Sequence, residues 1–416
     1  MRQCGLSFSL DTQVDTYTDR FAAPEHRLGV CRVTVAVVFF GARYFLKFHS
    51  RKARLTSTRK KNAGSRVFPA TAAVGSSIDL TRLLDIVGAF SRQTIGVIGD
   101  FVLDEFASGE ISRVSREAPV LILRHRHTEC YPGGGANAVN NLAELGARVL
   151  PVGVVGDDHA GEVLLEFFRH KGVNTSGVLR SRNWLTATKT RYLAGWTHTT
   201  EQQVLRMDRE PSGSLPESVA QSIERKARQA ARQADALILS DYGFGAATPS
   251  LARRLRGKCV TLDSRYRLLE YAGAGITAAT PNEPELEAAY HQRIGNDMAK
   301  LEKLGTRLLK DLALEALVVT RGKDGMAVFE ANSADAGSEP LVRQISIYGS
   351  DAPVDVTGAG DTVIAVLSLA LAAGASYLEA AHLANYAGGI VVMKRRTATV
   401  SAAELASVLR REATAR

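Results

Sequence analysis

The sequence predicts an α/β protein with a doubly wound, mainly parallel sheet flanked by helices and a small β-sheet lid. From residue 216 onward, apolar runs of strand length alternate with longer stretches of helical period, which is typical of a parallel sheet. Polar residues recur where these runs end, so we expect one ligand crevice along the carboxyl edge of the sheet. Two polar, alternating segments, 109–131 and 186–208, interrupt the pattern and predict the lid.

The composition indicates a globular protein with ample material for a large core. Hydrophobic residues make up 45% of the 416 positions and charged residues 23%. No apolar run approaches the length of a membrane span, so no membrane association is expected. The four cysteines show neither metal-ligand spacing nor a disulfide framework, which favours a cytoplasmic location.

The positive charge of the chain is confined to its first 77 residues. The formal net charge is +9, and residues 1–77 hold 13 of the 52 basic and 4 of the 43 acidic side chains, so the remainder is neutral. The basic pI therefore gives no reason to expect a nucleic-acid-binding face on the body. Residues 1–77 show no sustained helical or strand period. They are interpreted as a disordered or non-native extension, with a membrane-surface or nucleic-acid arm as the alternative.

The body begins near residue 78 with a helix and a buried strand. The strand ends in a polar turn at Asp100, and Asp104 follows shortly. Ligands collect at the carboxyl ends of strands in open α/β sheets, so both aspartates are site candidates, with ordinary turn aspartates as the alternative. The elements expected before the second lid segment are a helix at 80–87, a strand at 94–99, a helix up to Leu145, a strand at 148–155 and a helix at 158–171.

Three glycines, Gly133 to Gly135, stand directly before the helix that ends at Leu145. Read as G-x-G-x-x-A, they could form a dinucleotide fingerprint, with Asp157 or Asp158 about 20 residues further on. The preceding segment is polar and alternating rather than a buried first strand, which argues against that interpretation. Glycines before a helix can equally let a sugar ring approach the backbone.

The second half of the chain supplies the regular part of the α/β pattern. Polar residues follow its strands at 240–242, 263, 280–285 and 320–322, which places them along the expected crevice. The expected helices are 216–233, 248–256, 283–290, 295–312, 362–373, 376–392 and 402–411, and the expected strands are 236–240, 258–262, 275–279 and 316–320.

The segment from Asp355 to Asp361 combines an anion-binding backbone with a carboxylate. Gly358 and Gly360 stand directly before a long apolar helix, so the free N–H groups of its first turn and its dipole favour an anion there. Asp361 adds a carboxylate at the same point, and a base beside an anion site is what phosphoryl transfer to a hydroxyl requires. The alternative is that Asp361 only caps the helix and the glycines form a turn.

Several other catalytic motifs are absent from the sequence, which has no G-x-x-x-x-G-K-[ST] loop, no serine nucleophile elbow and no His-x-x-x-His pair. Three motifs together resemble the ribokinase/PfkB sugar-kinase family, and their order and spacing match that family over about residues 90–412. They are Asp355–Thr362, Gly133-Gly134 with Asn137, and Asn282–Glu285. The segments 111–120, 240–242, 320–322 and 356–362 most resemble its heptose 7-phosphate kinase branch, which makes lipopolysaccharide-core precursors.

That resemblance implies a kinase domain over residues 78–416 that uses ATP and Mg²⁺ to phosphorylate a sugar phosphate. The roles it implies are Asp361 as general base; Gly358, Ala359 and Gly360 as the anion hole; Asn282 and Glu285 near the Mg²⁺-bound phosphates, Glu285 through water; Thr320, Gly322 and Asn385 in the nucleotide pocket; Asp104, Gly134 and Asn137 on sugar hydroxyls; and Asp355 in a loop that binds a monovalent cation such as K⁺.

A phosphorylated sugar also needs a cationic clamp, and four basic residues lie on or between the expected lid strands. Guanidinium groups bind phosphate through paired hydrogen bonds. The candidates are Arg113, Arg116, Lys189 and Arg191, with solvated surface charges as the alternative. Unpaired strand edges in the lid also predict a homodimer through the lid.

The chain departs from the heptose branch at three places. Phe244 stands where relatives often have Lys, Ser264-Arg265 stands where they often have Pro-Lys, and Arg396 stands where they usually have Gly. The first two leave the sugar open, and the third bears on K⁺ activation because it neighbours the cation loop. The alternatives are a kinase for another sugar or a nucleoside, a non-catalytic sugar-binding regulator and, more distantly, an NAD oxidoreductase supported only by the glycines at 133–135.

Overall fold

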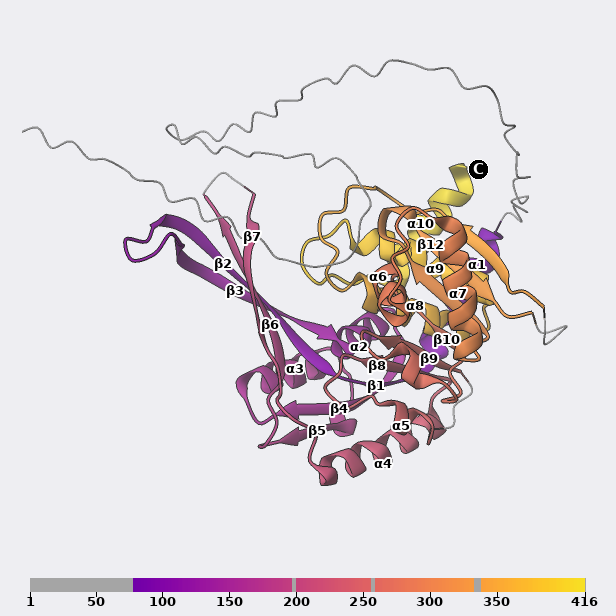
Figure 1. Cartoon of the computed structure of the whole chain (residues 1–416), viewed down its shortest axis with the longest axis horizontal. Helices are drawn as coiled ribbons and strands as arrows, with labels where there is room; N and C mark the ends of the chain where they lie inside the picture. The colour runs from indigo at the N-terminus through magenta and orange to yellow at the C-terminus, as the bar shows by residue number, and fades with distance from the viewer. Residues whose placement is uncertain (1–77, 197–199, 256–258, 333–337, 416) are drawn as a thin grey trace, which may run out of the picture. The chain divides into compact units, whose positions relative to one another are not determined.

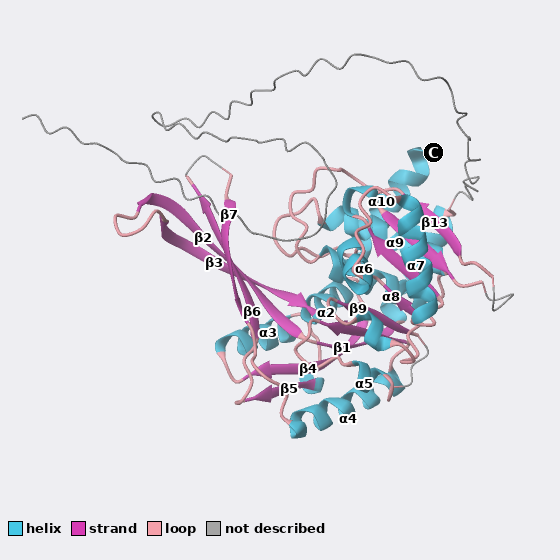
Figure 2. Ribbon diagram, in the orientation of Figure 1, coloured by secondary structure: helices cyan, strands magenta, loops and turns pink. Residues whose placement is uncertain are grey.

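The computed structural model describes residues 78–196, 200–255, 259–332 and 338–415. The predicted extension over residues 1–77 lies outside this described part. Within it, nine strands form the main sheet (Figure 2). In spatial order they are β13 (Leu341–Ile345), β12 (Met326–Glu330), β11 (Ala316–Thr320), β10 (Ala278–Ala279), β9 (Val260–Ser264), β8 (Ala236–Asp241), β1 (Thr94–Gly99), β4 (Arg148–Gly156) and β5 (Val178–Ser181).

The strand order confirms the predicted doubly wound, mainly parallel sheet. The pairs from β5 through β1 to β11 are all parallel, whereas β12 and β13 add an antiparallel edge. The chain passes from β1 to β4 on one side and later returns to β8 on the other side. The strand order therefore reverses between β1 and β8, and ligands of open α/β sheets bind in the crevice at such a reversal.

Alternate residues of the buried strands face two separate cores, as the period of two in a strand requires. Ile238 and Val318 face the first core, whereas Leu237, Leu239 and Val319 face the second. The first core is completed by α1 (Leu80–Gly88), α2 (Gly135–Glu144), α3 (His159–His170), α8 (Ala359–Ala372), α9 (Tyr377–Val391) and α10 (Ala402–Ala415). The second is completed by α4 (Glu217–Gln233), α5 (Pro249–Ala252), α6 (Glu283–Tyr290) and α7 (Met298–Asp311).

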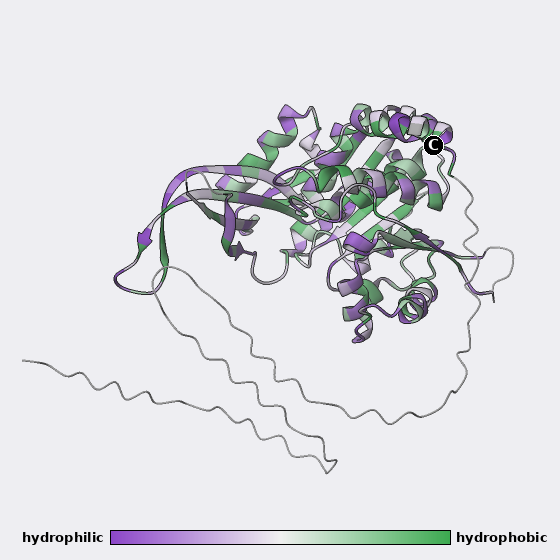
Figure 3. Cartoon of the chain, turned by 90° about the horizontal axis from the view of Figure 1, so that it is seen from above, coloured by the Kyte–Doolittle hydropathy of each residue, from purple (hydrophilic) through white to green (hydrophobic). Residues whose placement is uncertain are grey.

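Helix α8 is buried along most of its length. Every residue from Asp361 to Ala370 is buried. A helix that is apolar all round must be surrounded by protein, and α8 packs against β8, β9, α2 and α9. Figure 3 shows the same contrast, with apolar colour along the strands and packed helices and polar colour on outward faces. The body of α8 is therefore enclosed by protein from Asp361 onward, whereas its first residues reach the surface.

A second, four-stranded sheet forms the lid. Its order is β3 (Leu121–Gly134), β2 (Phe101–Val114), β6 (Ala187–Gly195) and β7 (Gln202–Arg209). Figure 1 shows these strands projecting from the main sheet as long ribbons. Strand β2 begins immediately after β1, with only Asp100 between them, so the lid is anchored directly in the sheet.

Several elements differ from the sequence-based expectation. The helix expected at 362–373 begins at Ala359, so the glycines belong to its N-cap and first turn. Strands β5, β12 and β13 were not predicted. Helix α5 ends at Ala252 rather than 256, and β10 has two residues. Short 3-10 helices lie at Phe90–Arg92, Thr175–Gly177, Leu268–Tyr271 and Gly322–Asp324.

Among the described residues, no helix is both long and apolar enough to span a bilayer.

Candidate active site

The start of α8 depends on a glycine at position 358. Gly358 is the N-cap and has a left-handed backbone, with φ of 78°. A Cβ atom there would lie 2.4 Å from Asn137 Nδ2 and 2.8 Å from Thr397 Cγ2, so only glycine fits. Asp361 lies in the first turn rather than at the cap, which excludes the interpretation of Asp361 as the N-cap residue.

The backbone amides at this helix start are not all available to a ligand. The N–H of Ala359 donates to the carbonyl oxygen of Val356 at 3.2 Å and is therefore already used by the turn. Within the described part of the chain, the N–H groups of Gly358 and Gly360 have no hydrogen-bond partner. Gly360 is exposed, so its amide can meet an anion from outside the helix.

Asp361 is a buried carboxyl group that accepts two hydrogen bonds. The hydroxyl of Tyr242 donates to Oδ1 at 2.9 Å, and Asn137 Nδ2 donates to Oδ2 at 3.0 Å. Burial raises the pKa of Asp361 to about 7, although the bonds from Asn137 and Tyr242 oppose the rise. A carboxyl group with this pKa can take up and release a proton near neutral pH, as a general base must.

A chain of buried side chains fixes the orientation of Asn137. Asn141 Nδ2 donates to Asn137 Oδ1 at 3.1 Å, so the amide nitrogen of Asn137 must point the other way, toward Asp361. Thr362 Oγ1 in turn donates to Asn141 Oδ1 at 3.1 Å. Helices α2 and α8 are thereby joined at the carboxylate.

Tyr242 is held in place by the reversal point of the sheet. The carboxylate of Asp100, at the end of β1, accepts the N–H groups of Tyr242, Phe244 and Ala246 at 2.8–2.9 Å. Asp100 therefore shapes the loop after β8 rather than facing a ligand. The sequence placed Tyr242 only among the crevice residues. Its bond to Asp361 was not foreseen, because it joins positions 119 residues apart.

The predicted sugar-binding residues surround the same carboxylate. Asp104 is buried near the root of the lid and lies close enough to raise the pKa of Asp361. Gly134 caps α2 with φ of 57°, and Asn137 lies in the first turn of that helix. A Cβ atom at Gly133 would meet Asp104 Oδ2 at 2.5 Å, so glycine allows this strand to approach. Asp104, Gly134 and Asn137 are thus brought together beside Asp361.

The predicted phosphate clamp is not assembled in one place. Arg191 donates to Asp104 Oδ1 at 2.6 Å, and Lys189 pairs with Asp208 at 2.9 Å. Arg113 is exposed nine positions beyond Asp104 on β2, which is about 30 Å at about 3.3 Å per residue. Arg116 lies in the loop between β2 and β3. Lys189 lies opposite Asp104 in the register of β2 and β6, and the side chain of Arg191 bonds to Asp104 directly.

A cavity of about 340 Å³ opens on the other side of the helix start. Ala359 and Gly360 form part of its wall, together with the predicted nucleotide residues Thr320, Gly322 and Asn385. Asn385 is fixed by donating to the carbonyl oxygen of Ser346 at 2.9 Å. Much of the remaining wall is apolar, and its size suits a base and ribose. It includes Met326, Ile347, Val356, Val363 and Val392.

Asn282 and Glu285 form a reciprocal capping box at the start of α6. Asn282 Oδ1 accepts the N–H of Glu285 at 2.8 Å, and Glu285 Oε2 accepts the N–H of Asn282 at 2.9 Å. Burial raises the pKa of Glu285, and burial with Glu285 and Asp361 nearby raises that of Asp263 well above its usual value. No group of three or more metal-binding side chains was found among the described residues. Glu285 and Asp361 nevertheless lie close enough to Asp263 to raise its pKa, so the three carboxyl groups are neighbours.

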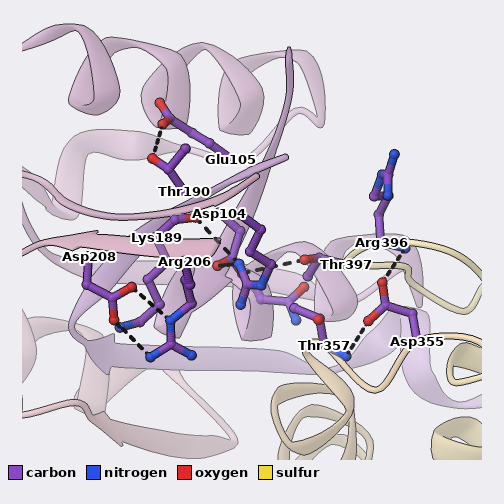
Figure 4. A network of polar contacts seen from close by, with 12 residues as sticks. Asp104, Glu105, Lys189, Thr190, Arg206, Asp208, Asp355, Thr357, Arg396 and Thr397 are labelled. Carbon is purple, nitrogen blue, oxygen red and sulfur yellow. Dashed lines mark hydrogen bonds and ion pairs between the residues drawn. The ribbon is translucent and has the colours of Figure 1, made fainter. Parts of the chain in front are cut away.

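Asp355, predicted to neighbour a monovalent cation, is held by two backbone amides. Thr357 N–H donates to Oδ1 and Arg396 N–H donates to Oδ2, each at 3.0 Å (Figure 4). Arg396 has a left-handed backbone with φ of 67°. Glycine adopts such a conformation without the steric cost that a Cβ atom brings. One lone pair on each carboxylate oxygen is left for a further ligand.

Comparison with known proteins agrees with this arrangement. Residues 97–404 match the family described as pfkB family carbohydrate kinase. Curated proteins named Bifunctional protein HldE are similar: that of Desulfatibacillum aliphaticivorans is 41% identical over 330 residues, covering 78% of this chain and 64% of that protein. The one from Mesorhizobium japonicum is 38% identical over 331 residues, covering 78% and 63%. The chain thus spans a little under two thirds of the length of these relatives.

Solved structures show the same fold at low sequence identity. Ribokinase of Arabidopsis thaliana, complexed with ribose and ATP, has a TM-score of 0.58 at 19% identity and covers 76% of this chain and 99% of its own. Phosphofructokinase-2 of Escherichia coli, in complex with substrates and products, has a TM-score of 0.61 at 17% identity and covers 77% and 99%. The main sheet and its flanking helices are therefore those of a ribokinase-like fold.

Proposed function

Because this chain belongs to the pfkB family of carbohydrate kinases, we propose that it transfers the γ-phosphoryl group of ATP to a sugar phosphate. The proposed acceptor is the anomeric hydroxyl of D-glycero-β-D-manno-heptose 7-phosphate, which would give the 1,7-bisphosphate for ADP-heptose and lipopolysaccharide-core synthesis. The observation that carries the proposal is the buried carboxylate of Asp361 between the nucleotide cavity and the sugar residues. The identity to proteins named Bifunctional protein HldE supports the heptose branch.

In the proposed reaction, Asp361 accepts the proton of the sugar hydroxyl as its oxygen bonds to the γ-phosphorus. The bond from that phosphorus to the bridging oxygen of ADP breaks at the same time. The N–H groups of Gly358 and Gly360 donate to the phosphoryl oxygens that gain charge, and each such donor is worth about 3–4 kcal/mol of barrier. The residues therefore act by positioning and by electrostatics, as is usual for phosphoryl transfer.

Magnesium is the cofactor that the family implies, and the acidic crevice suits it. Mg²⁺ prefers carboxylate and water oxygens and neutralises phosphate charge when bound. Glu285 would hold it through water, with Asn282 fixing the carboxylate of Glu285 through the capping box. Burial raises the pKa of Glu285 and of Asp263, and a cation bound here would oppose that rise by favouring their ionised forms.

Potassium at the loop of Asp355 is a further proposal. The half-buried carboxylate of Asp355 keeps a free lone pair on each oxygen after accepting the amides of Thr357 and Arg396. Exchange of KCl for tetramethylammonium chloride at constant ionic strength should lower the rate, and Asp355→Asn should abolish the difference. Equal rates of the wild-type protein in both salts would refute a potassium site.

A coupled assay of ADP release, run over a panel of sugars, sugar phosphates and nucleosides, tests the function. The wild-type protein should turn over the heptose 7-phosphate with the highest kcat/KM. Asp361→Asn should lose about 10²–10⁴-fold in kcat, the usual contribution of a general base. Asp85→Asn, on the exposed face of α1, is the matched control and should retain wild-type rates.

The same assay separates the alternatives. Preference for another sugar or a nucleoside would change the substrate but keep the dependence on Asp361, and Phe244 and Arg265 are the positions where such a change would arise. A non-catalytic regulator is not favoured, because Asp361 and its two hydrogen-bond donors are in place. If no acceptor releases ADP and Asp361→Asn behaves like the wild type, the kinase proposal fails.

We also propose a homodimer through the lid and a cytoplasmic location. All eight residues of β7, an edge strand of the lid, are exposed, including Val204, Leu205 and Met207. An uncovered edge with apolar side chains favours pairing with a second copy. The free thiols of Cys130 and Cys259 suit a reducing compartment.

A further inference from the structure

Arg396 adopts a backbone conformation that its side chain would normally avoid. Its φ of 67° is left-handed, and among the described residues only His291 and Ala313 share a positive φ without being glycine. Such a conformation costs a residue with a Cβ atom stability, so it persists only where other contacts compensate. The contacts of the Arg396 side chain supply this compensation.

The guanidinium group of Arg396 binds the lid at three separate segments. Nε donates to Glu129 Oε2 of β3 at 2.8 Å, and Nη2 donates to Glu201 Oε2, just before β7, at 3.1 Å. The group also lies 5.1 Å from the ring centroid of Phe106 on β2. The Arg396 side chain is only 16% exposed, and it holds the pKa of Glu129 below its ordinary value. These are partly buried ion pairs, which are costly to break by removing one partner.

The backbone of the same segment binds the loop that carries the base. Arg396 N–H donates to Asp355, and Asp355 accepts the N–H of Thr357 with its other oxygen. Thr357 directly precedes the N-cap glycine of α8. The next residue, Thr397, lies 3.5 Å from Asp104 Oδ2 through its hydroxyl group. Figure 4 shows Asp355 between Arg396 and Thr357, with Thr397 directed toward Asp104.

We propose that Arg396 is a positioning residue that connects the lid to the loop of the catalytic base. Its side chain bonds to Glu129 and Glu201 of the lid and its backbone N–H to Asp355, and this connection is called the latch. The inference rests on the proposed function for its kinetic consequences. With the latch in place, β2 holds Asp104 beside Asp361 before the sugar arrives, so less ordering remains to be done on binding. Glycine at this position would relieve the backbone but would leave Glu129 and Glu201 without their shared cation.

Arg396→Gly tests whether Arg396 positions the lid or only stabilises the fold. The variant removes the guanidinium contacts, while the relief of the left-handed backbone limits the loss of stability. We expect the KM for the sugar phosphate to rise at least about tenfold, because a partly buried ion-pair network is lost. The KM for ATP should change by less than about threefold, since the proposed nucleotide cavity lies on the other side of α8 and, within the described residues, its lining makes no hydrogen bond or ion pair with Arg396. The melting temperature should change little, because the relief of the left-handed backbone offsets much of the cost of the lost ion pairs. Arg396→Lys should recover only part of the loss in sugar affinity. The lysine keeps the positive charge, but a single ammonium group cannot bond to both glutamates as the guanidinium group does.

Hydrogen exchange of the apo protein measures the latch without any substrate. Amides of β2 and β3 should exchange faster in Arg396→Gly and in the double variant Glu129→Gln/Glu201→Gln than in the wild type. Arg395→Ala is the matched control: the Arg395 side chain is exposed and has no hydrogen bond or ion pair within the described residues. It should leave exchange and both KM values unchanged.

The outcomes decide between the latch and its alternatives. Unchanged lid exchange in Arg396→Gly would overturn the latch, and so would equal loss of stability, kcat and both KM values. If no sugar phosphate is turned over by the wild-type protein, the proposed function fails. The exchange comparison would then still confirm or reject the connection between lid and loop.

Discussion

At the scale of single residues, the ionisation of Asp361 governs the proposed reaction. Burial would keep this carboxyl group protonated to an unusually high pH, and the donors Tyr242 and Asn137 limit the rise of its pKa to about 7. The three side chains come from three distant parts of the chain. The resulting balance gives a base that is strong enough to take a hydroxyl proton yet ionised near neutral pH.

The activity of the wild-type enzyme should depend on pH through Asp361. The base acts only when deprotonated, so kcat/KM for the sugar phosphate should fall about tenfold per pH unit below the pKa of about 7 and level off above it. A profile at fixed ionic strength and saturating Mg²⁺-ATP measures this. A rate that stays constant down to pH 5 would exclude a base with a raised pKa.

Tyr242→Phe should move that acidic limb to higher pH. The hydroxyl of Tyr242 donates to Asp361 and lowers its pKa, so its removal leaves the charged carboxylate less stabilised. The same pH profile measures the shift. Tyr271→Phe is the matched control, because that hydroxyl donates to Asp241 instead. An unshifted limb in Tyr242→Phe, or an equal shift in both variants, would contradict the assignment.

Asp361→Asn should stabilise the protein at alkaline pH while it abolishes activity. The pKa of Asp361 is about 7 in the folded protein against an ordinary 3.8, so its contribution to stability is present below pH 4 and is lost as the pH rises toward 7. The amide stays neutral and can still bond to Asn137 and Tyr242. At about 1.4 kcal/mol per pKa unit, the gain at pH 8 is at most a few kcal/mol. Urea unfolding at pH 8 and pH 5 measures it, and a gain that is not larger at pH 8 would contradict the prediction.

At the scale of elements, the two glycines that start α8 serve different purposes. Gly358→Ala places a methyl group against Asn137 at a left-handed position, so it should cost about 1–3 kcal/mol of stability and disturb Asp361. Gly360→Ala meets nothing within 4 Å and should be neutral or stabilising by about 0.5–1 kcal/mol. Its methyl group would nevertheless face the nucleotide cavity and raise the KM for ATP. Thermal unfolding and ATP kinetics of both variants test this contrast, which equal stabilities would refute.

The sequence predicted the elements whose signals are local. Helices with long apolar faces and the buried strands β1, β4, β8 and β11 carry their periodicity within themselves. Strands β5, β12 and β13 are short, and they become strands by pairing at the edges of the sheet: β5 with β4, β12 with β11 and β13 with β12. The start of α8 was placed three residues late because glycines usually end a pattern, whereas here Gly358 caps the helix.

The site was predictable where a motif carries it and not where distant side chains meet. Asp361, Asn137 and Asp104 were expected to share a site, and the structure brings them together. The bond of Tyr242 to Asp361 and the contacts of Arg396 join segments far apart in the chain, so no local pattern reports them. The sequence also could not show that Arg191 and Lys189 are paired with carboxylates of the lid.

At the scale of the whole molecule, the fold places the proposed sugar-binding and nucleotide-binding residues on opposite sides of one helix start. Residues from the reversal point of the sheet and the root of the lid gather on the sugar side, and residues after β11 and from α9 gather on the nucleotide side. The phosphoryl group would pass between them at Gly360. We predict that this arrangement does not need residues 1–77. This stays a prediction, since those residues lie outside the described part of the chain.

The proposed dimer depends on one face of the edge strand β7. Leu205 and Met207 are two positions apart, so they share a face, whereas Val204 is left unpaired where the register of β6 and β7 shifts. Each buried side chain of this size contributes about 1.5–3 kcal/mol, so Leu205→Asp/Met207→Asp should weaken self-association by about 100-fold or more. Light scattering after gel filtration should give a dimer for the wild type and a monomer for the double variant. Val204→Asp, which adds one charge at the unpaired position of the register shift, should remain a dimer. A monomeric wild type would exclude the lid interface, and a monomeric Val204→Asp would show that the edge itself, rather than this face, is what pairs.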